Sequence, residues 1–180
     1  MKDLKIVPLD LKTDIPQIAE WETKYKNHKG YKAIEHFILE DNTYYSLAEV
    51  IEINHEMYPI GEDERKHALA IKNKENNLVG FVLATIMDKT TPSPCMFLQY
   101  VVISPEFQGQ GFGKKTVKEI TENAEQYFDV PITEFFGYVH NQNYHSMKLM
   151  LDLGASLKAM EKSSYYRAIK YMPKLDLDKE

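Results

Sequence analysis

The sequence predicts a mixed α/β domain. After a short first strand, helical patterns come first, and strands then alternate with helices from His67 onwards. Helix-start signals at Asp14 and Ser46 precede apolar residues at helical spacing, whereas apolar strand-like runs begin at His67. A glycine-rich turn at residues 108–113 then joins a strand to a helix. With 180 residues, 43% apolar and 27% charged, the chain can build one core, and collagen-like, coiled-coil and wholly disordered classes are excluded.

The elements follow one another with short polar connections. Proline and glutamine after Asp14 support a helix there, and Ser46 with Glu49 forms a capping-box pattern for another that ends before Pro59. We expect strands at 4–8, 67–72, 78–87, 96–103, 132–140, 157–160 and 163–171, and helices at 14–26, 33–39, 46–58, from about 113 to 127, and 143–153. Residues 1–173 form the single predicted domain and 174–180 a charged tail.

The net charge of −5 is unevenly distributed along the chain. Nine acidic residues and no lysine or arginine lie between Ala33 and Glu64, which leaves the remaining chain with 22 basic against 18 acidic residues. A mildly acidic chain is a poor match for nucleic acid. The single cysteine, Cys95, excludes an internal disulfide, no Cys/His spacing indicates a metal site, and the longest apolar run is too short to span a membrane. We therefore expect a cytoplasmic protein without a metal or a membrane partner.

The strongest chemical signal is the turn Gln108-Gly109-Gln110-Gly111-Phe112-Gly113. Free backbone N–H groups at the start of the following helix suit a phosphate or pyrophosphate, and Lys114 adds positive charge. The glycine spacing fits neither a P-loop nor a dinucleotide fingerprint. The alternative interpretation is a tight turn whose glycines only relieve backbone strain.

Two motifs resemble the GNAT superfamily of acyl-CoA-dependent N-acetyltransferases. Residues 108–113 match its Q/R-x-x-G-x-G/A signature, and Asn143-x-x-Ser146-x-x-Leu149 closing on Gly154 is similar to its second motif. The order of elements agrees from Leu4 to about Tyr171. The resemblance implies a GNAT fold, with a central mixed, mostly antiparallel twisted sheet of about seven strands flanked by about four to five helices.

The resemblance also implies acetyl-CoA as the cofactor. The backbone amides of Gln108, Gly109, Gln110, Gly111, Phe112 and Gly113 would hold its pyrophosphate, with Lys114 close by. Backbone groups of Val101, Val102 and Ile103 would pair with the pantetheine arm, which Asn143 would also contact, and Ser146 and Lys148 would lie near its distal parts. Asn143 is equally suited to be a helix N-cap.

The implied reaction is direct attack of an amine on the acetyl thioester. Many family members place a tyrosine after the leucine of the second motif as the acid, but Met150 stands there, and the strand 96–100 carries no carboxylate base. His140 is the nearest titratable candidate, with a polar strand-end residue as the alternative interpretation. Tyr144, Tyr165 and Tyr166 are candidate hydroxyl acids.

The acidic stretch supplies candidates for the acceptor site. Glu49, Glu52 and Glu56 share one face of their predicted helix, in the region that covers the acceptor site in the family, and would attract a cationic amine such as a polyamine, an aminoglycoside or a basic peptide. A solvated helix face is the simpler alternative. An N-acetyltransferase is thus the leading hypothesis, with a noncatalytic acyl-CoA-binding or sensing module and a nucleotide hydrolase as alternatives. The oligomeric state is open, with a homodimer as the candidate.

Overall fold

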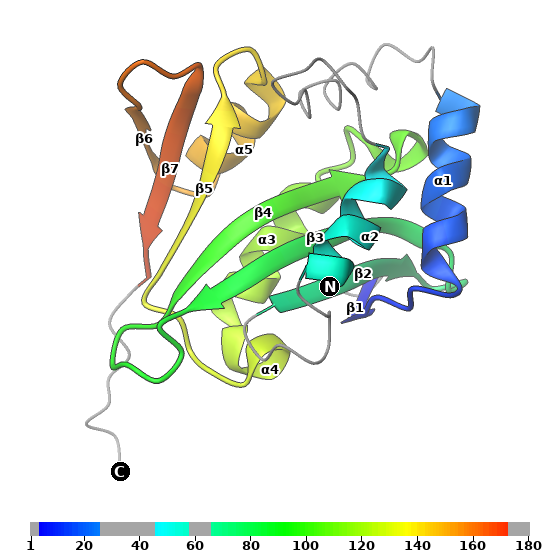
Figure 1. Ribbon diagram of the computed structural model, residues 1–180, viewed down its shortest axis with the longest axis horizontal. Coiled ribbons are helices and arrows are strands. Elements are labelled where there is room, and N and C mark those ends of the chain that lie inside the picture. The colour runs from blue at the N-terminus through cyan, green and yellow to red at the C-terminus, as the bar shows by residue number, and fades with distance from the viewer. Residues whose placement is uncertain (1–3, 26–45, 58–65, 173–180) are drawn as a thin grey trace. The chain divides into compact units, whose positions relative to one another are not determined.

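The computed structural model describes residues 4–25, 46–57 and 66–172 (Figure 1). Its strands form a seven-stranded sheet in the order β1-β2-β3-β4-β5-β7-β6. Strand β4 pairs in parallel with β5, while the pairs β1–β2, β5–β7 and β6–β7 are antiparallel. The strands are β1 (Leu4–Pro8), β2 (Lys66–Asn73), β3 (Leu78–Met87), β4 (Cys95–Ile103), β5 (Glu134–His140), β6 (Ser156–Ala159) and β7 (Tyr165–Tyr171). The mixed, mostly antiparallel sheet predicted from the sequence is confirmed.

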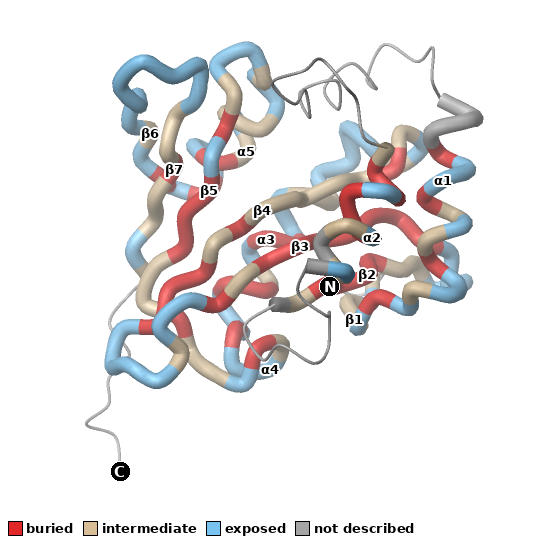
Figure 2. The backbone as a smooth tube through the Cα atoms, viewed as in Figure 1, coloured by how far each residue is buried: buried red, intermediate tan, exposed pale blue. Residues whose placement is uncertain are grey.

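The chain divides into two compact units, and β3 and β4 contribute residues to both. The first unit holds β1, β2, most of β3, the end of β4, and the helices α1 (Asp14–Tyr25) and α2 (Leu47–Met57). Its apolar core joins both helices to the sheet through side chains such as Ile18, Trp21, Ile51 and Phe81, all buried. Figure 2 shows buried stretches of backbone on α1, α2 and β3. The amphipathic pattern of each helix therefore faces the strands, as the sequence indicates.

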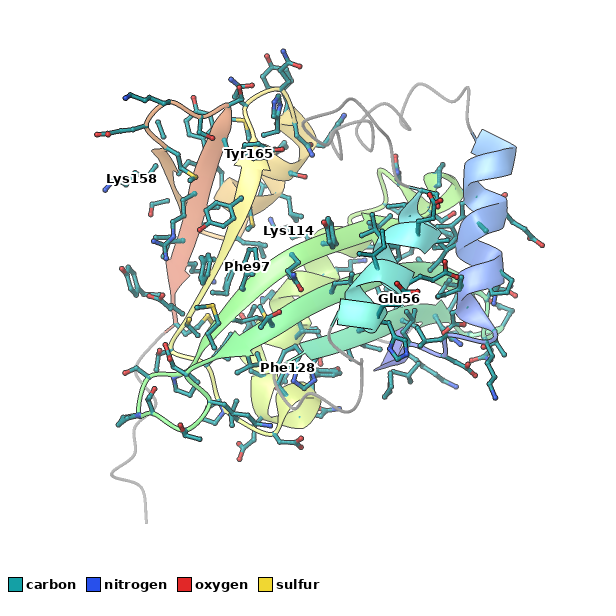
Figure 3. All side chains as sticks on the ribbon, viewed as in Figure 1. Glu56, Phe97, Lys114, Phe128, Lys158 and Tyr165 are labelled. Atoms are coloured by element: carbon teal, nitrogen blue, oxygen red, sulfur yellow. The ribbon has the colours of Figure 1, made fainter. Side chains whose placement is uncertain are left out.

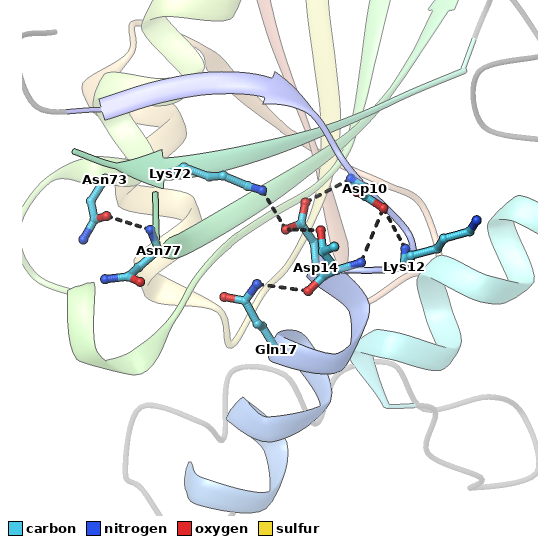
Figure 4. A network of polar contacts seen from close by, with 8 residues as sticks. Asp10, Lys12, Asp14, Gln17, Lys72, Asn73 and Asn77 are labelled. Carbon is cyan, nitrogen blue, oxygen red and sulfur yellow. Dashed lines mark hydrogen bonds and ion pairs between the residues drawn. The ribbon is translucent and has the colours of Figure 1, made fainter. Parts of the chain in front are cut away.

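A buried ion pair ties the start of α1 to the sheet (Figure 4). The Asp14 carboxylate is fully buried and lies 2.8 Å from Lys72 Nζ on β2. The backbone N–H of Asp10 donates to the same carboxylate over 2.9 Å, so the connection between β1 and α1 is held as well. The helix-start signal at Asp14 is confirmed, because α1 begins at this residue. Its acid does not cap the helix as an N-cap residue would, since the carboxylate makes a long-range contact with Lys72.

The second unit holds the start of β4, the strands β5 to β7 and most of the helix α3 (Phe112–Glu122). The short helix α4 (Ala124–Phe128) follows, so the single predicted helix is interrupted at Asn123. The helix α5 (Tyr144–Asp152) lies beside β5 and β7 in Figure 1. Met150 of α5 packs on Gly137 of β5, because a Cβ added at Gly137 would lie 3.1 Å from the Met150 methyl group.

Most predicted elements are confirmed with small changes at their ends. β3 matches its predicted range, β5 starts two residues late, and the capping box at α2 forms with Ser46 N donating to Glu49 Oε2 over 2.7 Å. The predicted helix at 33–39, the helix stop at Pro59 and the charged tail 174–180 lie outside the described residues. The single-domain boundary at residue 173 stays a prediction.

The ion pair predicts a stability effect. Replacing Asp14 by alanine leaves the mostly buried Lys72 ammonium without its partner, so we expect the free energy of unfolding to fall by about 2–4 kcal/mol in urea titrations. Glu20→Gln, on the exposed side of the same helix, is the control and should change stability by less than about 0.5 kcal/mol. An equally small effect for Asp14→Ala would contradict the assignment.

Candidate functional site

The glycine turn begins where β4 is held tightly against β3. Ser104, which follows β4, is buried and donates its N–H to the Val79 carbonyl over 2.8 Å. A Cβ at Gly80 would overlap the Val102 carbonyl oxygen, so only glycine permits this close approach of the strands. The short 3₁₀ helix η2 (Pro105–Phe107) then leads into the turn. The end of β4 therefore gives the turn a fixed starting point.

Two glycines of the turn have left-handed backbones. The φ angles are +74° at Gly109 and +77° at Gly111, and a Cβ added at either would meet nothing within 4 Å. Glycine is needed at these two positions because of the backbone conformation and not because a side chain would be crowded. The surface over the turn is therefore open to a ligand. α3 begins directly afterwards at Phe112, so its first backbone N–H groups and the positive end of its dipole lie beside this surface.

The glutamine side chains brace the turn. Gln108 Nε2 donates to the Ile103 carbonyl over 2.9 Å, and Gln110 Nε2 donates to the Glu106 carbonyl over 3.3 Å. These two hydrogen bonds connect the turn to the end of β4 and to η2. The backbone amides of Gln108 and Gln110 stay candidates for cofactor binding, but their side chains have structural partners that the motif alone does not reveal.

An acid that the sequence analysis missed joins two of the predicted cofactor lysines. Asp152 lies 3.1 Å from Lys148 Nζ and 3.8 Å from Lys114 Nζ, both at the protein surface. The hydrogen bond from Lys148 is the main reason that the pKa of Asp152 lies below its usual value, and Lys114 adds to the effect. Because Lys148 and Asp152 are four residues apart on α5, their ion pair could have been predicted from the sequence. The contact of Asp152 with Lys114 on α3 could not, since it depends on the fold.

Asn143 is confirmed as the N-cap of α5. Its Oδ1 accepts the backbone N–H of Ser146 over 3.0 Å. The cap uses the carbonyl end of the side chain and leaves the amide group as the donor that a ligand could use. At the other end of the helix, Gly154 has φ +82° and its N–H donates to Leu151 O, which explains the terminal glycine of the motif.

No replacement for the family's usual acid appears at position 150. The Met150 side chain is buried against β5 and has no ionisable group. On β4 the polar side chain of Gln99 accepts a hydrogen bond from the Thr85 hydroxyl over 3.1 Å. Gln99 therefore supplies an amide, already hydrogen-bonded to β3, and not a carboxylate that could act as a base. The described residues of β4 contain no carboxylate.

His140 and Tyr144 differ in their surroundings. His140 Nδ1 accepts the backbone N–H of Gln142 over 3.2 Å, which assigns the proton of the neutral ring to Nε2. Its ring meets Tyr165 edge-on, with centroids 5.1 Å apart. Tyr144 is 73% exposed at the start of α5. The Nδ1 lone pair of His140 is therefore used in the hydrogen bond with Gln142. Of the candidate tyrosines, Tyr165 contacts His140 with its ring.

The three acids predicted for the acceptor site lie on the exposed side of α2, on which Figure 3 labels Glu56. Glu49 completes the capping box, and its hydrogen bonds with Ser46 hold the pKa of its carboxyl below the usual value. Glu49 therefore has a structural role, whereas Glu52 and Glu56 are exposed carboxylates. The other six acids of the 33–64 stretch lie outside the described residues.

A search of the described residues finds no cluster of three or more potential metal ligands. Among the same residues, no helix is long and apolar enough to cross a membrane.

The comparisons with known proteins identify the family. The model of the acetyltransferase (GNAT) family matches residues 18–155, so the chain belongs to this family of acetyltransferases, whose acetyl donor is acetyl-CoA. No curated protein sequence gives a significant match.

Solved structures share the fold at low sequence identity. An N-acetyltransferase (PaiA) from Thermoplasma acidophilum in complex with coenzyme A is 21% identical, with TM-score 0.59 over 94% of this chain and 99% of that chain. Spermidine N-acetyltransferase from Vibrio cholerae in complex with CoA and spermine is 15% identical, with TM-score 0.65 over 95% and 96% of the two chains. An acetyltransferase from Thermus thermophilus is 14% identical, with TM-score 0.64 over 94% and 97%.

Proposed function

We propose that this protein transfers an acetyl group from acetyl-CoA to a primary amine. The observation that carries the proposal is the turn at 108–113, in which two left-handed glycines leave open space beside the start of α3. Such a turn matches the size and charge of a pyrophosphate. Family membership supplies the reaction class, and the residues around the turn support the binding mode.

Residues of both motifs would hold the cofactor. The amides of residues 108–113 would bind the pyrophosphate, with Lys114 and Lys148 adding positive charge. The register between β4 and β5 covers Cys95 to Phe97 of β4. Val101, Val102 and Ile103 lie beyond this paired part of the strand, so their backbone groups could pair with the extended pantetheine arm of the cofactor. The amide of Asn143 and the hydroxyl of Ser146 are further donors. When bound, acetyl-CoA supplies the thioester carbonyl that the amine attacks.

Deprotonation of the acceptor is the main chemical demand on the protein. An aliphatic amine with a pKa of about 10.4 is almost entirely protonated at pH 7, and its neutral form costs about 4.6 kcal/mol. His140 can take a proton only at a nitrogen already bonded to Gln142 N–H. We propose that the ammonium proton would leave through a water relay to solvent, with His140 orienting the relay by hydrogen bonding. The hydroxyl of Tyr165 or Tyr144 would give its proton to the departing thiolate and regain one from solvent.

The acceptor is proposed to be a cationic amine. Glu52 and Glu56 are exposed acids on α2, suited to attract positive charge without touching the reacting nitrogen. A carboxylate directly beside that nitrogen would raise its pKa and oppose the reaction. Several of the similar structures are of spermidine N-acetyltransferase from Vibrio cholerae, and one of them is dodecameric. Self-association of the present chain stays a prediction.

The proposed activity is tested by thiol release from acetyl-CoA with a panel of primary amines, including spermidine, aminoglycosides, amino acids and basic peptides. We expect turnover above the hydrolysis background with at least one amine. Saturable CoA binding without turnover on any amine would contradict the proposal and favour a noncatalytic CoA-binding module.

The turn itself predicts a selective loss of cofactor binding. Gly111→Val forces a β-branched residue into a left-handed backbone and covers the open surface, so CoA affinity should fall by at least about 100-fold in calorimetric titrations. Gly154→Val is the matched control, because Gly154 has φ +82° and equally open space but lies outside the turn. Equal CoA affinities of the two variants would contradict the assignment.

Charge neutralisation on α2 tests the acceptor proposal. Replacing Glu52 and Glu56 together by glutamine should raise KM for spermidine about two- to tenfold and reduce its salt dependence, with KM for acetyl-CoA unchanged. Glu20→Gln, an exposed acid on α1, serves as the control. An unchanged KM for every cationic acceptor would show that these acids only form a solvated helix face.

A further inference from the structure

Arg167 on β7 is a partly buried cation that forms no ion pair with the acids among the described residues. Its Nε is buried without a hydrogen-bond partner, a state shared among the described residues only by the neutral Thr116 hydroxyl. Its guanidinium carbon lies 4.7 Å from the centre of the Phe136 ring. No ion pair of Arg167 occurs within the part of the chain that the structure describes. Buried polar groups normally have partners, so a missing partner calls for an explanation.

The neighbours of Arg167 increase its need for an anion. In the sheet register Arg167 stands directly opposite Lys158 of β6 on one side and Tyr138 of β5 on the other, so these three side chains share one face. Two cations opposite one another destabilise a sheet. The acid on the same face of β5, Glu134, stands opposite Tyr171 and forms no ion pair with Arg167 among the described contacts.

This face of the second unit is also open and aromatic. The opposite face is buried, with Phe135, Val139 and Ala168 at 5% exposure or less, and α5 packs on it through Met150. On the open face Tyr138 is 46% exposed and Tyr165 37% exposed. Figure 3 labels Phe97, Tyr165 and Lys158, which come from β4, β7 and β6. We call the side chains of Phe97, Phe136, Tyr138, His140, Lys158, Tyr165 and Arg167 the aromatic face.

A pocket lies on the aromatic face beside Tyr138, the cross-strand neighbour of Arg167. It has a volume of about 310 Å³ and is lined by Tyr138, Met160, Ser163 and Tyr165. The pocket is shallow and wide open to solvent, so it can hold a side chain of a ligand that lies on the sheet surface. Because Tyr138 lines the pocket and stands opposite Arg167, a ligand could fill the pocket and reach the guanidinium together.

We infer that the aromatic face binds an acceptor that carries a carboxylate as well as an amine, with Arg167 receiving the carboxylate and the pocket holding the side chain. The acceptor class is therefore an amino acid or a peptide with a free C-terminus. This inference rests on the proposed acetyl transfer and narrows its acceptors from polyamines and aminoglycosides to basic amino acids and peptides. These carry both the positive charge that Glu52 and Glu56 would attract and a carboxylate. Arginine matches a carboxylate with two parallel N–H donors, and its packing on Phe136 fixes the position of the donors.

Matched acceptors test the inference. The probes are an equimolar mixture of the twenty amino acids and the mixture of their carboxamides, each assayed by thiol release, followed by single compounds and dipeptides. For the wild-type protein we expect kcat/KM to be about 10- to 100-fold higher for the acids than for the amides. Arg167→Gln should bring this ratio close to one, mainly through KM, and Arg167→Lys should give an intermediate ratio because it keeps the charge and loses the paired donors.

Lys170→Gln is the matched control, since Lys170 lies on the same strand but pairs with Phe135 on the opposite face; the ratio should not change. Equal kcat/KM for acids and amides in the wild-type protein would overturn the inference. So would a preference for the acids that is the same in Arg167→Gln as in the wild-type protein. Absence of turnover with every amine would contradict the proposed activity. In that case the carboxylate site is tested separately, by thermal melting of the CoA-saturated protein with the acids and with the amides. Stabilisation by the acids alone, lost in Arg167→Gln, supports the carboxylate site; its absence refutes it.

Discussion

The left-handed backbone of Gly109 and Gly111 is the constraint on which the cofactor side of this structure depends. It turns the chain from the end of β4 into α3 within a few residues and leaves backbone N–H groups beside an open surface. The conformation is held from outside the turn, by the Ser104 bond to Val79 and by the Gln108 side chain on Ile103. The proposed phosphate would therefore meet N–H donors whose positions the fold has already fixed.

Local patterns account for the part of the structure that the sequence predicts. The capping box of Ser46 and Glu49, the N-cap of Asn143 and the C-terminal Gly154 each depend on residues within four positions of one another. Apolar periodicity placed the strands to within a few residues for the same reason. The interruption at Asn123 was missed because apolar residues continue at helical spacing through it, which hides the change of helix.

Contacts between distant segments could not be predicted in this way. Asp14 carries a good N-cap signal, yet its carboxylate pairs with Lys72 on β2. Glu49 belongs to a row of acids, but its hydrogen bonds with Ser46 give it a structural role. No sequence pattern singles out Arg167, because its surroundings form only when Lys158, Phe136 and Tyr138 are brought around it by the fold. Only then does its Nε stand without a hydrogen-bond partner among the described residues. The chemistry of the acceptor therefore has to be read from tertiary contacts.

The binding of CoA at the glycine turn is tested most directly by amide hydrogen exchange at residues 108–115 with and without CoA. Bound phosphate oxygens would accept hydrogen bonds from these N–H groups, so we expect exchange in this segment to slow by at least about tenfold on CoA addition. The polar hairpin at residues 73–77 should exchange at the same rate in both states and serves as the internal reference. Saturating CoA that leaves exchange at 108–115 unchanged would contradict the central claim.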